Sequence, residues 1–156
     1  PRIRREPKGV GLIISLWNFP FFLATMPIIG ALAAGSCWVL KPSELSPSSS
    51  KILGVLVPRY LDQRACRVIQ GGVEETTALL DLKWDHIFYT GNARSARHIA
   101  QKAAVHLTPT TLELGGKCPV LLDPSSTDLD LAAKRILPGK CLKSGWVLNY
   151  SCLHRA

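Results

Sequence analysis

Four short polar segments of this sequence combine residue types that bind or activate small molecules. They are Asn18, residues 41–44, residues 91–92 and Glu113. An asparagine amide donates hydrogen bonds, and a lysine beside a glutamate can bind a phosphate or the hydroxyls of a ribose. A glutamate between two leucines can act as a general base if desolvation raises its pKa. Each segment also has a structural interpretation, as a turn residue, a solvated ion pair or a helix start, and these alternatives stay open for each segment alone.

Alternating strands and helices predict how these segments are positioned. Apolar runs predict strands at residues 10–16, 37–40, 67–70, 86–89, 111–114 and 120–122. Helices are predicted at residues 21–34, 48–60, 74–80, 93–104 and 128–137. This order with short connections indicates an α/β fold, a Rossmann-like parallel sheet with helices on both faces. Ligands bind such sheets beyond the carboxyl ends of the strands, where we expect all four polar segments to lie.

Composition excludes several other classes of function. The 156 residues are 47% hydrophobic, enough for a domain with its own core, and the formal net charge is +8. The basic residues are scattered, and their one cluster, residues 2–8, has no interleaved aromatic residues, so we expect no nucleic-acid partner. The five cysteines form no CxxC pair and no zinc-binding spacing with histidine, which predicts reduced thiols and no metal site.

One long uncharged segment, residues 9–40, has the length of a membrane span. Asn18, Pro20, Pro27 and Gly35 interrupt it, and a lipid-exposed helix tolerates few such residues. We therefore expect a buried strand, a loop, a helix and a second strand in series, and no membrane span.

Four motifs, in this order, resemble those of the aldehyde dehydrogenases. They are Trp17-Asn18-Phe19-Pro20, Lys41-Pro42-Ser43-Glu44, Tyr89-Thr90-Gly91 and Leu112-Glu113-Leu114-Gly115-Gly116-Lys117. Residues 70–76 and 106–109 resemble the class 3, fatty-aldehyde type of the family. The resemblance covers residue 6 to about residue 140. It implies an incomplete cofactor-binding domain at residues 1–140, followed by a divergent tail at residues 141–156.

The resemblance also implies a role for each motif residue. Asn18 would donate its amide to the oxyanion of the thiohemiacetal, and Glu113 would be the general base. The residues expected to contact the cofactor, NAD or NADP, are Trp17, Lys41, Ser43, Glu44, Gly91, Asn92 and Leu114. Among them, Lys41 and Glu44 would hold the adenosine ribose, the start of the helix at residues 91–92 would face the pyrophosphate, and Leu114 would lie beside the nicotinamide. The choice between NAD and NADP stays open, because Glu44 favours a free 2′-hydroxyl whereas Lys41 tolerates a phosphate.

The catalytic cysteine of the family is not found where the resemblance places it. A Gly-Gln-Thr-Cys sequence is expected there, but this chain has Gly145-Trp146-Val147-Leu148. An alkyl side chain cannot attack a carbonyl carbon. Cys141 and Cys152 are nearby but do not match the motif. We therefore expect a fragment that is inactive by itself in the oxidation of an aldehyde to a carboxylic acid with NAD(P)+.

Two alternatives remain. The chain could be a non-catalytic module that binds a dinucleotide or pairs with a full-length homologue, or it could fail to fold stably alone. The resemblance further implies a small-molecule aldehyde substrate and homodimeric full-length relatives. It does not specify which aldehyde is oxidised. We also expect a cytoplasmic location, in keeping with reduced thiols.

Overall fold

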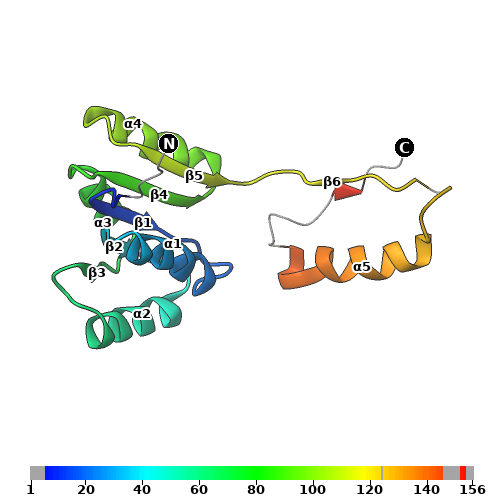
Figure 1. The fold of residues 1–156 in the computed structure, drawn as a ribbon, viewed down its shortest axis with the longest axis horizontal. Coiled ribbons are helices and arrows are strands. Elements are labelled where there is room, and N and C mark those ends of the chain that lie inside the picture. Colours follow the sequence, from blue (N-terminus) through cyan, green and yellow to red (C-terminus); the bar gives the residue numbers. More distant parts are fainter. Residues whose placement is uncertain (1–5, 124, 146–151, 154–156) are drawn as a thin grey trace. The chain divides into compact units, whose positions relative to one another are not determined.

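The structure, a computed structural model, describes residues 6–123, 125–145 and 152–153, and it divides into two compact units at residues 114 and 115. Arg2, Arg4, Arg5 and Leu148 lie outside the described residues. The first unit contains β1 (Val10–Ile14), α1 (Phe22–Ala33), β2 (Cys37–Lys41), α2 (Pro47–Tyr60), β3 (Cys66–Val68), α3 (Val73–Leu80), β4 (His86–Gly91), α4 (Ala93–Val105) and β5 (Thr110–Leu114) (Figure 1).

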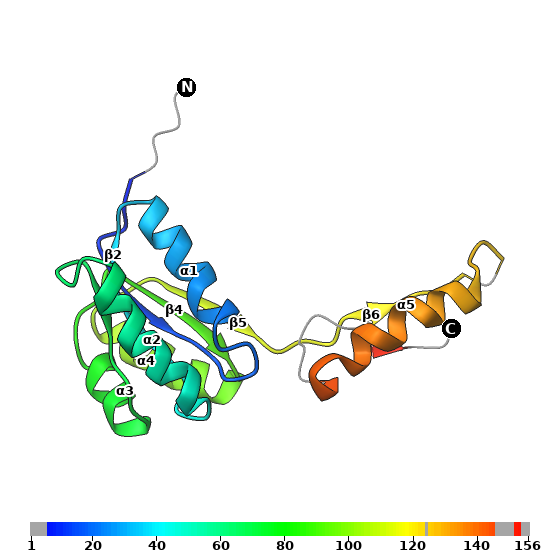
Figure 2. The ribbon, with the colours of Figure 1, turned by 90° about the horizontal axis from the view of Figure 1, so that it is seen from below.

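The five strands of the first unit form one parallel sheet in the order β3-β2-β1-β4-β5. At its centre, Leu12 of β1 lies opposite Val39 of β2 and Ile87 of β4. The predicted α/β class with a parallel sheet is therefore confirmed. Figure 2 shows the sheet with its helices from a second direction.

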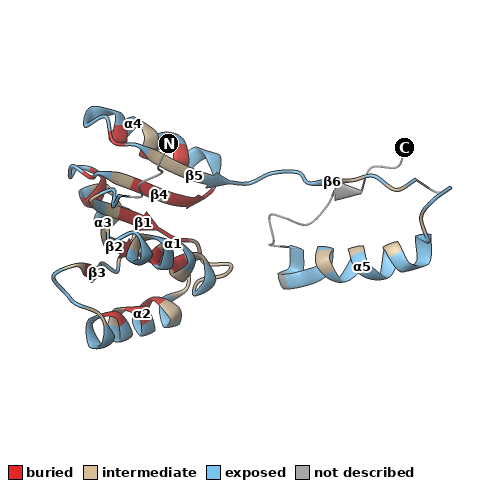
Figure 3. Cartoon of the chain, viewed as in Figure 1, coloured by how far each residue is buried: buried red, intermediate tan, exposed pale blue. Residues whose placement is uncertain are grey.

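Both faces of the sheet are covered by helices, because its central strands are apolar on both sides. Leu12 and Ile14 pack on the face covered by α3 and α4, where Ile99 of α4 is buried. Ile13 points to the opposite face, which α1 and α2 cover, and there it packs with Leu40. In Figure 3 the buried residues follow the strands and the inward sides of these helices. This double burial explains why the strands read as continuous apolar runs.

Local sequence signals set several of the boundaries. Helix α1 is followed by Gly35 at φ +78°, a left-handed conformation that glycine adopts without a steric penalty. Helix α4 begins after Asn92, whose side-chain oxygen accepts a hydrogen bond from the backbone N–H of Ser95 at 2.9 Å. Pro47 opens α2, at a position where a missing N–H costs nothing.

The second unit differs from the prediction. It contains β6 (Pro119–Val120), α5 (Leu129–Cys141), a 3₁₀ turn (Leu142–Gly145) and β7 (Cys152–Leu153). The strand predicted at residues 120–122 is shorter, and it pairs with β7 rather than with the five-stranded sheet. Helix α5 continues past residue 137 through Pro138, and none of its residues is buried. The domain boundary expected at residue 140 rests on the family resemblance, and it stays a prediction.

The uncharged segment at residues 9–40 forms β1, α1 and β2, in the order expected from the sequence. No helix within the described part of the chain is both long enough and apolar enough to cross a membrane.

Candidate functional site

The strand order creates a crevice at the carboxyl ends of β1 and β4. The chain leaves β1 toward α1 on one face of the sheet, and it leaves β4 toward α4 on the other face. In an open α/β sheet, connections that diverge in this way leave a crevice between the two neighbouring strands. Such a switch point is where open α/β sheets bind ligands.

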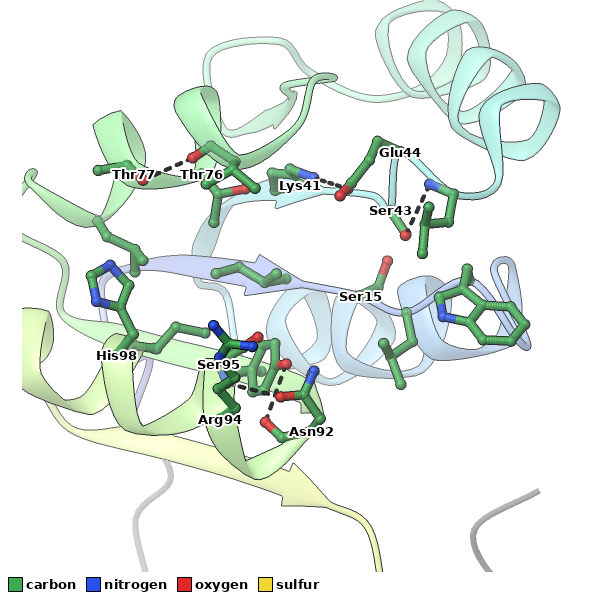
Figure 4. Close-up of a pocket in the computed structure, with 18 residues that line it drawn as sticks. Ser15, Lys41, Ser43, Glu44, Thr76, Thr77, Asn92, Arg94, Ser95 and His98 are labelled. Atoms are coloured by element: carbon green, nitrogen blue, oxygen red, sulfur yellow. Dashed lines mark hydrogen bonds and ion pairs between the residues drawn. The ribbon is translucent and has the colours of Figure 1, made fainter. Parts of the chain in front are cut away.

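A cavity of about 490 Å³ lies at this edge. This volume lies within the range of small-molecule sites in proteins. Its walls come from four parts of the first unit: the end of β1, the turn after β2, helix α3, and the end of β4 with the start of α4. In Figure 4, Lys41, Ser43 and Glu44 lie on one side of the cavity, Asn92, Arg94 and Ser95 lie on the other, and Ser15 lies between them.

Lys41 is a buried cation in this cavity wall. Its side chain is only 3% exposed, and its Nζ donates to Glu44 Oε2 at 2.9 Å and to the carbonyl oxygen of Pro42 at 3.0 Å. A buried ammonium group requires such partners, because removing it from water is costly. The Glu44 side chain is 47% exposed, so the pair presents a charged and solvent-accessible end to the cavity.

The ion pair also determines the ionisation of Glu44. Partial burial by itself raises the pKa of this carboxyl group, but the hydrogen bond and the positive charge of Lys41, together with a backbone hydrogen bond, bring the pKa below its ordinary value of 4.5. The carboxylate is therefore ionised at neutral pH and can accept hydrogen bonds from hydroxyl groups.

This lowered pKa predicts a pH-dependent contribution to stability. The contribution is fully present above the unfolded-state pKa of about 4.5, and it is lost as the pH falls through the lower folded-state pKa. We expect the difference in free energy of unfolding between the wild type and Glu44→Gln to shrink between pH 7 and pH 3, measured by urea unfolding. Glu74→Gln, which removes an exposed glutamate, is the control. A difference that does not change with pH would contradict the ion-pair explanation.

Ser15 places an unused polar group in the cavity wall. Its side chain is buried, and Oγ has no hydrogen-bond partner among the described residues. Its backbone N–H donates to the carbonyl oxygen of Lys41 at 3.1 Å, which fixes Ser15 directly beyond β1. Buried hydroxyl groups are nearly always paired, so this oxygen is available to a molecule that enters the cavity.

The start of α4 forms the opposite wall. Asn92 uses its side-chain oxygen to cap the helix, which leaves its side-chain amide N–H groups for other partners. Arg94 stands in the first turn, where a cation is unfavourable for the helix dipole but would complement an anionic ligand. Gly91 is buried, and a side chain there would overlap the hydroxyl group of Tyr89. This contact provides a packing reason for glycine in the motif.

The structure brings together five of the nine residues singled out from the sequence. The residues that line the cavity are Trp17, Lys41, Ser43, Glu44 and Asn92. Asn18 follows Trp17 in the same turn, but neither it nor Gly91 lines the cavity.

Glu113 and Leu114 lie elsewhere at the sheet edge. They end β5, the outermost strand, where Glu113 pairs with Thr90 of β4 and Leu114 with Gly91. The sequence left open whether Glu113 is partly desolvated or solvated, and in the structure both residues are exposed. An edge strand has a neighbour on one side only, and the flanking leucines do not shield the carboxylate between them.

Several polar residues of the cavity wall were not predicted from the sequence. They are Ser15, Thr76, Thr77, Arg94, Ser95 and His98. Thr76 and Thr77 donate to carbonyl oxygens of their own helix, to Gly72 at 2.7 Å and to Val73 at 2.8 Å respectively. A threonine in a short helix has no distinctive signal in a single sequence, and the position of α3 beside the cavity follows only from the strand order. Among the described residues, no group of histidine, cysteine, aspartate and glutamate could hold a metal ion.

Comparison with protein families gives one match that extends over most of the chain. The family described as "Aldehyde dehydrogenase family" matches residues 1–148. Aldehyde dehydrogenase family 3 member I1, chloroplastic, of Arabidopsis thaliana is 59% identical over 95% of this chain and 26% of its own length. Family 3 member A2 of Pongo abelii is 52% identical over 92% of this chain and 29% of its own length. The "dimeric NADP-preferring" aldehyde dehydrogenase of Canis lupus familiaris is 50% identical over 92% of this chain and 31% of its own length.

Comparison with solved structures gives matches to the same family. An AldH of Staphylococcus aureus in a substrate-bound state superposes with a TM-score of 0.89 and is 38% identical, over 96% of this chain and 33% of that protein. An aldehyde dehydrogenase of Mycobacterium tuberculosis complexed with NAD+ superposes with a TM-score of 0.83 and is 34% identical, over 96% of this chain and 31% of that protein. This chain therefore spans between a quarter and a third of the length of these relatives.

Proposed function

The chain belongs to the aldehyde dehydrogenase family, and from this premise we propose that its cavity binds the adenosine half of NAD+ or NADP+. One observation carries the proposal: a buried, ion-paired Lys41 and an unpartnered Ser15 hydroxyl group lie in one cavity at the switch point of the sheet. Class 3 relatives at 50–59% identity support aldehyde oxidation as the reaction of the whole protein.

The chemistry of the cavity wall fits a dinucleotide. Lys41 and Glu44 offer a donor and an acceptor 2.9 Å apart, a combination that suits the hydroxyl groups of a ribose. Across the cavity, Arg94 and the first turn of α4 offer positive charge and backbone N–H groups to a diphosphate. Ser15 lies between these two walls, and its hydroxyl group would donate a hydrogen bond to the bound molecule. In the bound state, NAD(P)+ supplies the hydride acceptor.

Asn18 and Glu113 are proposed to act on the reacting atoms rather than on the adenosine. The side-chain amide of Asn18 would donate to the oxyanion that forms when a thiolate attacks an aldehyde. The Glu113 carboxylate would accept a proton from the nucleophile or from the deacylating water. Their positions outside the cavity, beyond β1 and at the end of β5, are compatible with a separate place for the aldehyde.

We further propose that this chain does not oxidise aldehydes by itself. Leu148 stands where the resemblance places the nucleophilic cysteine, and leucine provides no thiolate. The domain organisation that accompanies this proposal is a partial cofactor-binding domain at residues 1–140 and a divergent tail at residues 141–156.

Titration calorimetry combined with a turnover assay tests both proposals. We expect NAD+, NADP+ or both to release or absorb heat on binding to the purified chain. We expect no NAD(P)H fluorescence when a medium-chain aldehyde is then added. No heat at millimolar coenzyme would reject the cofactor site, and sustained NAD(P)H production would reject the inactivity of the chain. A full-length class 3 relative is the positive control for both measurements.

A second candidate function is pairing with a full-length homologue. It is favoured by the canine relative at 50% identity, whose name describes it as dimeric. Size-exclusion chromatography of the chain mixed with a full-length class 3 relative tests this function. A shared peak that neither protein gives alone supports pairing, and unchanged elution of both rejects it.

A further inference from the structure

A carboxylate already lies at the start of α3, on the side of the cavity opposite α4. The side chain of Glu75, in the first turn of this helix, bends back so that Oε2 accepts the backbone N–H of Gly72 at 2.7 Å. Gly71 provides the space for this bend. It adopts φ +137°, and a side chain there would overlap the Glu75 carboxyl group.

This carboxylate belongs to a helix that lines the same cavity as the Lys41–Glu44 pair. Strand β3 lies beside β2, so the connection from β3 to α3 runs next to the carboxyl end of β2, where Lys41 lies. Val73 and Thr76, which flank Glu75 in α3, line the same cavity as Lys41 and Glu44.

The electrostatics of Glu75 agree with this placement. Hydrogen bonds from its own backbone and from Gly72 lower the pKa of the Glu75 carboxyl group. The charge of Lys41 lowers it further, whereas the charge of Glu44 raises it. Glu75 itself does not line the cavity, so at neutral pH its carboxylate stands behind the lining residues Val73 and Thr76, whereas Lys41 and the Glu44 carboxylate form part of the wall.

We propose that Glu75 is a specificity-determining residue for the coenzyme: its carboxylate occupies the N–H group at the start of α3 and weakens binding of a coenzyme that carries a 2′-phosphate. The inference rests on the proposed function, in which Lys41 and Glu44 hold the adenosine ribose and α4 faces the diphosphate. With the diphosphate at α4, the opposite edge of the ribose faces α3. A phosphate on the 2′-oxygen would then meet the Glu75 carboxylate and find the Gly72 N–H group already bonded.

The expected effect is moderate, because Glu75 is exposed and water screens its charge. A phosphate monoester carries a charge of about −1.5 to −2 at neutral pH, so the interaction with a nearby carboxylate is repulsive. A free 2′-hydroxyl carries no charge and does not experience this repulsion. Removing the carboxylate should therefore raise the affinity for NADP+ and leave the affinity for NAD+ nearly constant.

The test compares two substitutions that remove the same charge from the same helical turn. Glu75→Gln keeps a side-chain oxygen that can accept the Gly72 N–H, so the start of the helix is preserved. Glu74→Gln removes the neighbouring exposed glutamate and is the matched control. Calorimetric dissociation constants for NAD+ and NADP+ are measured for the wild type and for both variants.

We expect Glu75→Gln to lower the ratio of the NADP+ to the NAD+ dissociation constant by roughly twofold to fivefold, about the size of a surface charge interaction. Glu74→Gln should change this ratio by less than about twofold, because its carboxylate is not on the N–H group of Gly72. If both variants change this ratio equally, or if neither changes it, the role of Glu75 is overturned. That outcome does not contradict the proposed cofactor site. A wild-type chain that binds neither coenzyme overturns the proposed function, and the inference with it.

A second measurement does not depend on a variant. Because the proposed repulsion is electrostatic, raising the ionic strength should bring the NADP+ affinity of the wild-type chain closer to its NAD+ affinity. If the NADP+ affinity instead falls further below the NAD+ affinity as the ionic strength rises, the protein attracts the 2′-phosphate. That result contradicts the proposal.

Discussion

Replacing Lys41 by methionine is expected to weaken coenzyme binding by roughly tenfold to one hundredfold. This range corresponds to the free energy lost with one charge-assisted hydrogen bond. Lys41 is the only residue in the described cavity wall that joins a buried cation to a carboxylate, at 2.9 Å from Glu44. Its ammonium group would bind the ribose directly and would also hold the Glu44 carboxylate in position. Titration calorimetry with NAD+ measures the loss.

The same substitution should leave the chain folded. Methionine has a similar length and fills the volume of the buried lysine stem, and the partner carboxylate is 47% exposed, so it can be solvated when the cation is removed. Lys102→Met is the control, because it removes a lysine from the ion pair with Asp81 at the surface. We expect the control to bind NAD+ like the wild type. Equal affinities for Lys41→Met and Lys102→Met would show that the coenzyme does not contact the buried ion pair.

Replacing Leu12 by alanine is expected to lower the free energy of unfolding by about 2–5 kcal/mol, the range for truncation of a buried leucine. Leu12 is fully buried in the central strand, between Val39 and Ile87, so the surrounding strands cannot move in to fill the cavity. A domain of this size has a total stability of about 5–15 kcal/mol, so the loss is a large fraction of it.

Urea unfolding followed by tryptophan fluorescence measures this effect, since Trp38 and Trp84 are buried. Leu82→Ala is the matched control, because its leucine is 55% exposed, and we expect a change within about 0.5 kcal/mol. Equal stabilities of the two variants would contradict the position of β1 at the centre of the sheet. Loss of coenzyme binding in Leu12→Ala is also expected, because β1 positions Ser15 and Trp17.

The elements of the first unit could be predicted because their sequence signals are local. The run at residues 10–14 is apolar on both faces, and Gly35 and Asn92 mark helix ends through their own backbone and side-chain chemistry. The second unit was predicted less well, because β6 is two residues long and α5 continues through Pro138. Short strands and exposed helices bury too little apolar surface to leave a clear pattern in the sequence.

Motif order in the sequence identified the family and five of the residues that line the cavity. Lys41 and Glu44 could be paired from their spacing, since residues three apart in a turn can meet. The environment of Glu113 could not be predicted in the same way. Two flanking leucines suggest burial, but the exposure of Glu113 depends on β5 being an edge strand.

By itself, the sequence determined the strands and helices of the first unit and the family, because each depends on residues that are neighbours in the chain. Only the tertiary structure decided what forms the cavity. The order β3-β2-β1-β4-β5 brings α3 to the same cavity as α4, and with it Thr76 and Thr77. The physical reason is that strand order follows from the burial of apolar surface on both faces of the sheet, a property of the whole unit that no single segment encodes.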